Sequence, residues 1–181
     1  MTESPPSGAT SGPVVLGYDG SDAATRAIRH VAGLLPGAHA LVVTAWKPIS
    51  EAILAVSLGP APLISDPADA DQRQQRAASN LAREGARHAS QAGLEAEPLA
   101  VRADGPIWEA LDEVARDRDA RLVAVGSHGR PTMESVVLSR VSVGLVHHAS
   151  RPVLVVPSPQ PPGERRTDLP RAVRGSRTHR G

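Results

Sequence analysis

The sequence predicts an open α/β domain in which helices cover both faces of a parallel five-stranded sheet. Two observations support this class. Short apolar runs alternate with segments whose apolar residues recur at helical spacing, an order typical of parallel strands joined by right-handed crossovers. The apolar residues are mainly Ala, Val and Leu, with two Trp, one Tyr and no Phe. Small aliphatic side chains suit strands that are buried on both faces.

The expected elements follow one another in a regular order. Strands are expected at residues 14–18, 40–46, 96–101, 120–126 and 152–156. Helices are expected over residues 24–35, 69–91, 105–114 and 134–150. The strands are short apolar runs, whereas the helices carry an apolar stripe on an otherwise polar sequence. Strand and helix therefore alternate from the first element to the last.

Turn-forming residues mark where these elements end. Residues 19–21 (Asp-Gly-Ser) combine a turn with a helix cap, and residues 36–37 (Pro-Gly) end the first helix. Gly93 ends the long second helix, and Pro98 weakens the third strand. Residues 47–67 contain many prolines, so we expect a long variable connection there.

The chain divides into three predicted segments. Residues 1–12 are rich in Ser, Pro and Gly and predict a disordered arm, residues 13–157 form the domain, and residues 158–181 form a disordered basic tail. The formal net charge is +1. The tail arginines are Arg165, Arg166, Arg171, Arg174, Arg177 and Arg180. No aromatic residues are interleaved with them, so a solvated extension is expected and nucleic-acid binding is not.

Several classes of protein do not fit this composition. The sequence has no cysteine, which excludes disulfides, thiol catalysis and thiolate metal sites and suits a reducing cytosol. The first residues lack the apolar stretch of a secretory signal, and we find no apolar run long enough for a membrane span. A cytoplasmic location is therefore expected. Lys47 is the sole lysine, so a lysine-based phosphate loop is not expected elsewhere.

Three strand ends should meet at one edge of the predicted sheet. They are residues 17–19 (Gly-Tyr-Asp), residues 45–46 (Ala-Trp) and residues 126–129 (Gly-Ser-His-Gly). Ligands of open parallel sheets bind at such an edge. Two glycines followed by a helix offer backbone N–H groups to an anion such as phosphate. On residues 126–129 alone, a tight turn from strand to helix is the favoured interpretation.

Two long segments resemble a known family. VVLGYDGSDAATRAIRHVAGLL, near the start, and VAVGSHGRPTMESVVLSRVSVGLVHHASRPVLVVP, near the end, are similar to the opening and closing segments of universal stress proteins. The resemblance covers roughly residues 13–157, and between these segments it extends only to the order of elements. It implies a Rossmann-like fold of the adenine nucleotide alpha hydrolase type.

The resemblance also implies a ligand, with one departure from the family pattern. ATP-binding members carry Gly, two residues, Gly, nine residues, and then Gly followed by Ser or Thr. Gly126 and Gly129 match this pattern, but the final pair is replaced by Ser139 and Arg140. Val141 and Ser142 then resume it. Arg140 could neutralise phosphate charge, or it could fill the space and pair with an acid.

Two further residues match the family's nucleotide contacts. Asp19 resembles the acid that contacts the ribose, although it could equally cap the following helix. Ala45 matches the position whose backbone contacts adenine. The resemblance therefore implies ATP or a related adenine nucleotide, with or without Mg²⁺. It also implies a homodimer formed through the strand at 152–156, with partner proteins unknown.

Other polar residues suggest no further chemistry. We interpret His128 and the pair His147 and His148 as exposed side chains, since adjacent helical residues point in different directions. Ser127 lacks the spacing of a nucleophile elbow. We therefore expect a nucleotide-binding stress protein that is not an enzyme. The alternative is a nucleotide-free interaction module of the same fold, favoured by Ser139 and Arg140.

Overall fold

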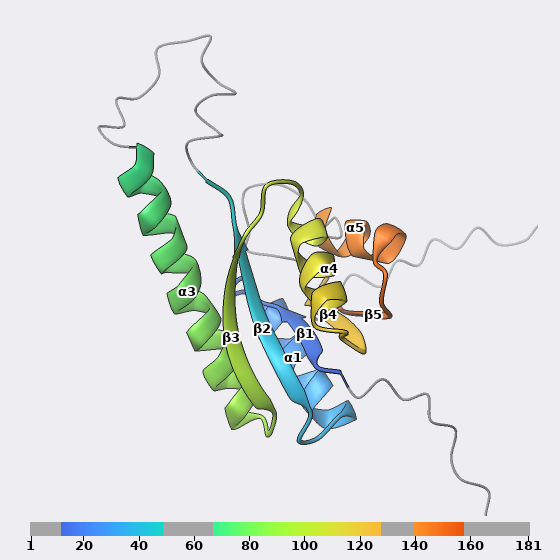
Figure 1. Cartoon of the computed structure of the whole chain (residues 1–181). Helices are drawn as coiled ribbons and strands as arrows, with labels where there is room; N and C mark the ends of the chain where they lie inside the picture. The colour runs from blue at the N-terminus through green and yellow to red at the C-terminus, as the bar shows by residue number, and fades with distance from the viewer. Residues whose placement is uncertain (1–11, 49–66, 128–139, 158–181) are drawn as a thin grey trace, which may run out of the picture.

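A computed structural model describes residues 12–48, 67–127 and 140–157, and it confirms the predicted fold class (Figure 1). The strands are β1 (Val14–Gly17), β2 (His39–Trp46), β3 (Glu95–Arg102), β4 (Leu122–Gly126) and β5 (Val153–Val156). The helices are α1 (Asp22–Leu34), α3 (Pro67–Gln91), α4 (Ile107–Asp117) and α5 (Arg140–His148). No helix in these ranges is long and apolar enough to cross a membrane.

All neighbouring strands of the sheet are parallel, and the order in which the chain adds strands reverses once. The strands pair in the order β3-β2-β1-β4-β5. The chain steps outward from β1 to β2 and β3, and then returns to place β4 on the other side of β1. The strand order therefore reverses between β1 and β4, which is where open α/β sheets bind ligands, beyond the carboxyl ends of the strands.

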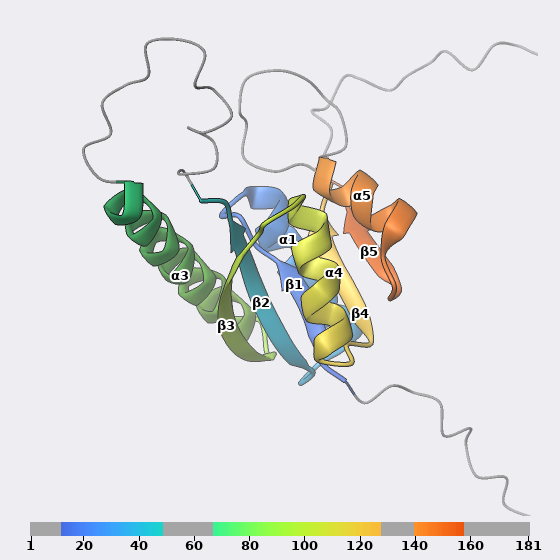
Figure 2. The same ribbon diagram turned by 45° about the horizontal axis from the view of Figure 1, so that its top comes forward.

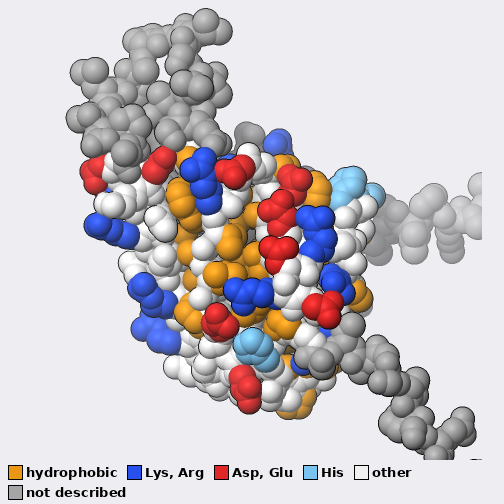
Figure 3. All heavy atoms as spheres, viewed as in Figure 1, with side chains coloured by type: hydrophobic (Ala, Val, Ile, Leu, Met, Phe, Trp, Pro, Cys, Tyr) orange, Lys and Arg blue, Asp and Glu red, His pale blue; other side chains and the backbone are white. Residues whose placement is uncertain are grey.

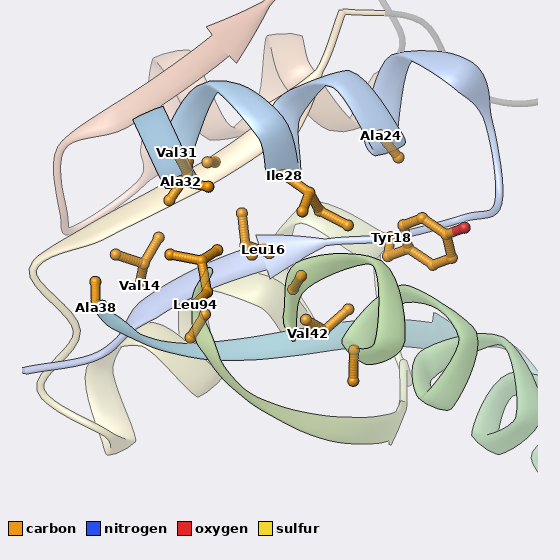
Figure 4. Packing of buried hydrophobic residues seen from close by; sticks show 14 residues of the cluster. Val14, Leu16, Tyr18, Ala24, Ile28, Val31, Ala32, Ala38, Val42 and Leu94 are labelled. Atoms are coloured by element: carbon orange, nitrogen blue, oxygen red, sulfur yellow. The ribbon is translucent and has the colours of Figure 1, made fainter. Parts of the chain in front are cut away.

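Helices cover both faces of the sheet, so the core has two layers (Figure 2). On one face α1 and α3 pack over side chains such as Leu16 and Val42, with Ile28 contributed by α1 (Figure 4). On the other face α4 and α5 pack over Val15 and Val43. Alternate residues of each strand thus enter opposite layers, which explains why the strands are apolar without interruption.

The edge strand β3 shows why a proline is tolerated within it. The amides of Glu95 and Ala103 donate to Ala38 and Trp46 at 3.0 and 2.8 Å, so odd-numbered residues of β3 bond to β2. Pro98 occupies an even position and faces the open edge, where its missing N–H costs no ladder hydrogen bond. Figure 3 views this edge, with Lys and Arg over α3, Asp and Glu over α4, and hydrophobic side chains between them.

Several predicted boundaries differ from the observed ones by one to three residues, and two of them have a clear cause. The helix predicted to reach residue 150 ends at His148, because the Ser150 amide and hydroxyl donate instead to Asp112 Oδ1 at 2.7 and 2.8 Å. The strand predicted from residue 120 begins at Leu122, because the Ala120 amide bonds to Ala115 O in the turn after α4. Several predicted segments lie outside the described residues. They are the start of the helix predicted over 134–150, nearly all of the N-terminal arm, most of the connection at 47–67 and the basic tail.

Candidate functional site

A hollow of about 200 Å³ lies at the carboxyl ends of β1, β2 and β4, where the strand order reverses. Its walls are mainly apolar, and of its described lining residues only Asp19 is charged. The lining consists of Gly17, Tyr18, Asp19, Ser21, Ala24, Val43, Thr44, Ala45, Leu81, Ile107, Leu111, Val125, Gly126 and Val141. This volume is below the range of about 300–1,000 Å³ for drug-sized ligands, so it suits part of a nucleotide better than a whole one.

Asp19 is fixed at the rim of this hollow by the turn that starts α1. Its Oδ1 accepts the Ser21 amide at 3.0 Å, and Gly20 between them has φ of 79°, a conformation that favours glycine. Ser21 is the N-cap of α1, and its Oγ accepts the Ala24 amide at 3.1 Å. Because a carboxylate has about four lone-pair sites, the same side chain can support the turn and still accept ligand hydroxyls.

The peptide group of Ala45 faces the hollow from the end of β2. Tyr18 N donates to Val43 O at 2.9 Å, so odd-numbered residues of β2 direct their N–H and C=O towards β1. Ala45 lies two residues further on, beyond the last paired residue of β1. The Thr44 hydroxyl donates to Tyr18 O at 2.9 Å. It takes the place that the Ala45 amide would occupy if the β1–β2 hydrogen bonds continued. One donor and one acceptor of the backbone are thus presented side by side.

Gly126 is required by packing as well as by any ligand. A Cβ at this position would lie 2.6 Å from Ala23 Cβ and 2.7 Å from the Ala23 carbonyl carbon. The end of β4 therefore touches the first turn of α1. The same close approach that brings β4 against α1 places the Gly126 backbone in the lining of the hollow.

The residues predicted at the phosphate end occupy different places. Val141 lines the hollow, whereas Arg140 is exposed at the start of α5 and is not among the lining residues. Ser142 is fully buried, and its hydroxyl donates to Ser127 O at 3.4 Å, so it joins α5 to the end of β4. Gly129 and Ser139 lie outside the described residues, as does His128.

Tyr18 is a polar residue of the site that sequence reasoning did not single out. Its ring lies at the carboxyl end of β1 near α3 (Figure 4), and its hydroxyl donates to Glu84 Oε1 at 3.2 Å. Burial, and to a smaller extent Glu84, raises the pKa of the Tyr18 hydroxyl, against a lowering hydrogen bond with Thr25. The sequence holds no signal for this pair, since the two residues are 66 positions apart.

Other features outside this hollow are less enclosed. A shallow hollow of about 750 Å³ lies between α3 and β3, away from the strand ends, and includes Arg83 and Arg87. His147 and His148 are exposed, and the His148 ring stacks on Trp108. Within the described ranges, no three His, Asp or Glu side chains are grouped so that they could hold a metal ion.

Comparison with known proteins gives one family. The sequence model of the universal stress protein family matches residues 11–157. No curated protein sequence matches the chain.

Solved structures share the architecture at low identity. The hypothetical protein MJ0577 is 18% identical, with a TM-score of 0.66 over 84% of this chain and 99% of its own. A universal stress protein in complex with cAMP is 26% identical, with a TM-score of 0.51 over 80% of this chain and 95% of its own. A universal stress protein from Archaeoglobus fulgidus in complex with dAMP is 17% identical, with a TM-score of 0.51 over 80% and 97%.

Proposed function

Because the chain belongs to the universal stress protein family, we propose that it binds ATP or a related adenine nucleotide in the hollow at the strand ends and acts in a stress response. One observation carries this proposal: the Asp19 carboxylate and the Ala45 peptide group border the same apolar hollow. Two distant relatives are complexes with the adenine nucleotides cAMP and dAMP.

The chemistry of the two groups matches the two parts of a nucleoside. The edge of adenine offers both acceptor and donor atoms, which suit the N–H and C=O of Ala45. The apolar walls, which include Leu111 and Val125, suit the faces of the base. Asp19 would accept hydrogen bonds from ribose hydroxyls, as acidic residues do at comparable sheet edges. Base and sugar are thereby held by groups that are already in place.

The phosphate end depends on β4 and α5. Gly126 allows close approach of a phosphate to the backbone at the end of β4. Arg140, exposed at the start of α5, would neutralise phosphate charge from outside the hollow. Mg²⁺ commonly binds through substrate phosphates and waters, so it belongs in every titration.

We do not propose catalysis for this site. Asp19 is the one charged group among the described lining residues, and holding the sugar already employs it. A general base would have to lie within hydrogen-bond reach of the attacking water, beside the phosphate. Any ATP hydrolysis is therefore expected to be slow and incidental.

A thermal-shift titration of the full chain tests the proposal. ATP with Mg²⁺, AMP and cAMP should each raise the melting temperature with increasing concentration, whereas GTP should not. A ligand at a hundred times its Kd stabilises by about 2.7 kcal/mol, which such a titration measures easily. Mass spectrometry of the denatured protein would show whether an adenine nucleotide is already bound after purification.

The second candidate function is a nucleotide-free interaction module of the same fold. The exposure of Arg140 favours it, because the residue at this position of the family pattern is not among the described residues that line the hollow. Absence of any stabilisation at millimolar adenine nucleotide would select this candidate over the first.

We also propose a homodimer formed through residues 152–156. The amides of Val123 and Ser127 donate to Pro152 and Val156 at 2.9 and 2.8 Å, so even-numbered residues of β5 bond to β4. Val153 and Val155 direct their N–H and C=O to the open edge, which unlike β3 has no proline at an outward position. Antiparallel pairing of two such edges gives a closed two-fold arrangement.

Sedimentation velocity tests the dimer. Each chain has a mass of 18.9 kDa, and the wild type should sediment as a dimer. Val155→Pro removes an outward N–H without removing a bond to β4, so it should give a folded monomer, with folding checked by circular dichroism. Pro98→Ala at the opposite edge is the matched control and should leave the dimer intact. A wild type that sediments as a monomer at all concentrations would refute this interface.

A further inference from the structure

Trp108 is held between two residues of α5 that lie one turn apart. A Cβ at Gly144 would lie 2.2 Å from Trp108 Cδ1 and 2.3 Å from Cγ, so the indole rests directly against the bare backbone of the helix. The indole also stacks on His148, with 5.0 Å between ring centroids and 29° between ring planes. Residues four apart share one helix face, so Gly144 and His148 form a single notch for the ring.

This contact lies directly behind the candidate site. Ile107, which precedes Trp108 on α4, lines the hollow, and so does Val141 in the first turn of α5. The α5 helix packs more extensively on α4 than on β5. Among the described residues, α5 is also held by the buried Leu145 and by the Ser142–Ser127 hydrogen bond, which at 3.4 Å is long for an O–H donor. Just beyond its end, Ser150 donates to Asp112 of α4. The α4 contact is therefore the main lateral constraint on α5.

We propose that Trp108 is a positioning residue that sets where the first turn of α5 lies beside the hollow, and thereby sets the grip on the phosphate end of the ligand. The inference rests on the proposed function. A helix of nine residues moves as a rigid body, so a shift at Gly144 is carried to Val141 and Arg140. The groups proposed to contact base and sugar are Asp19, which follows β1, and Ala45 on β2, whereas the indole of Trp108 rests on α5.

The expected signature is a split between two ligands. In Trp108→Leu, which keeps an apolar side chain but loses the stacked ring, the Kd for ATP should rise about tenfold, whereas the Kd for adenosine should change by less than about twofold. Trp108→Phe should restore most of the ATP affinity, because a phenyl ring can still stack in the notch. Leu34→Ala, at the exposed far end of α1, is the control and should alter neither Kd.

Gly144→Ala tests the same contact from the other helix. The added methyl group would displace α5 from the indole, so it should reproduce the loss for ATP and spare adenosine. This variant decides the question if Trp108→Leu proves too unstable to titrate by calorimetry.

The possible outcomes separate the two claims. Equal losses for ATP and adenosine in Trp108→Leu and Gly144→Ala, or no loss for either ligand, overturn the positioning role while the proposed function stands. A wild type that binds neither ligand overturns the proposed function and this inference together.

Discussion

The two halves of the candidate site are built in different ways. On the β1–β2 side, hydrogen bonds fix the backbone around Asp19 and Ala45, and both residues border the hollow. On the β4–α5 side, Gly126 is fixed by packing against α1, and Arg140 stands exposed outside the hollow. The groups proposed to contact base and sugar are therefore already in place, whereas the proposed phosphate contacts depend on how α5 is placed and on residues that depart from the family pattern.

The largest expected effect comes from filling the space at Gly126. Gly126→Val would force side-chain atoms into the first turn of α1, where even a Cβ would lie 2.6 Å from Ala23 Cβ. Overpacking of this kind costs about 1–3 kcal/mol, so the free energy of unfolding should fall by that amount and nucleotide binding should be lost with it. Urea denaturation followed by circular dichroism measures the change.

A glycine near the far end of α1 provides the control. Gly33 lies in α1 with nothing within 4 Å of its would-be Cβ, so Gly33→Ala should stabilise the domain by roughly 0.5–1 kcal/mol. If Gly126→Val proves as stable as the wild type and still binds nucleotide, the close approach of β4 to α1 is wrong.

Neutralising Asp19 should weaken the binding of every ligand that carries the ribose, whether or not it carries phosphate. In Asp19→Asn the amide oxygen can still accept the Ser21 amide, so the turn into α1 should survive. The charge-assisted bonds to ribose hydroxyls would be lost, and the Kd for adenosine, AMP and ATP should rise about tenfold alike. Calorimetric titration measures this, with Asp22→Asn in the exposed first turn of α1 as control. An unchanged Kd for adenosine would remove Asp19 from the sugar contact.

The smallest effect is expected from the hydroxyl of Tyr18. Tyr18→Phe removes the bond to Glu84 and should lower the free energy of unfolding by about 0.5–1 kcal/mol. The pKa of the Tyr18 hydroxyl is raised in the folded protein above its ordinary value of 10. The stability that the protonated hydroxyl contributes is therefore fully present below pH 10, and it is lost as the pH rises through the pKa of the folded state.

Denaturation measured across the alkaline range tests this last effect. The wild type should lose stability above pH 10 more steeply than Tyr18→Phe does. Parallel curves for the two proteins would show that the Tyr18 hydroxyl is ionised as readily in the folded as in the unfolded state.

The elements were predictable from sequence because their signals are local. Apolar runs, the Ser21 cap and Gly93, with φ of 96°, act within a few residues, and they mark most strands and helix ends to within one to three residues. What the sequence did not reveal depends on contacts between distant residues. The helix end at His148 is set by Asp112, 38 positions from Ser150. The Trp108–Gly144 contact likewise becomes visible only once α4 and α5 lie together.

The same distinction applies to the site. Asp19, Ala45 and Gly126 lie at one edge, as predicted, because the carboxyl ends of parallel strands converge there. The orientation of Arg140 and the burial of Ser142 could not be deduced, since both depend on how α5 rotates against its neighbours.

The most direct test of the central claim is amide chemical-shift mapping of the full chain during an adenosine titration. The largest shifts should fall on Ala45, on the Asp19–Ser21 turn and on Gly126 and Ser127. Asp19→Asn, with a Kd about tenfold higher, should require more ligand for the same change. Shifts confined to the open hollow around Arg83 and Arg87, or no shifts at millimolar adenosine, would contradict it.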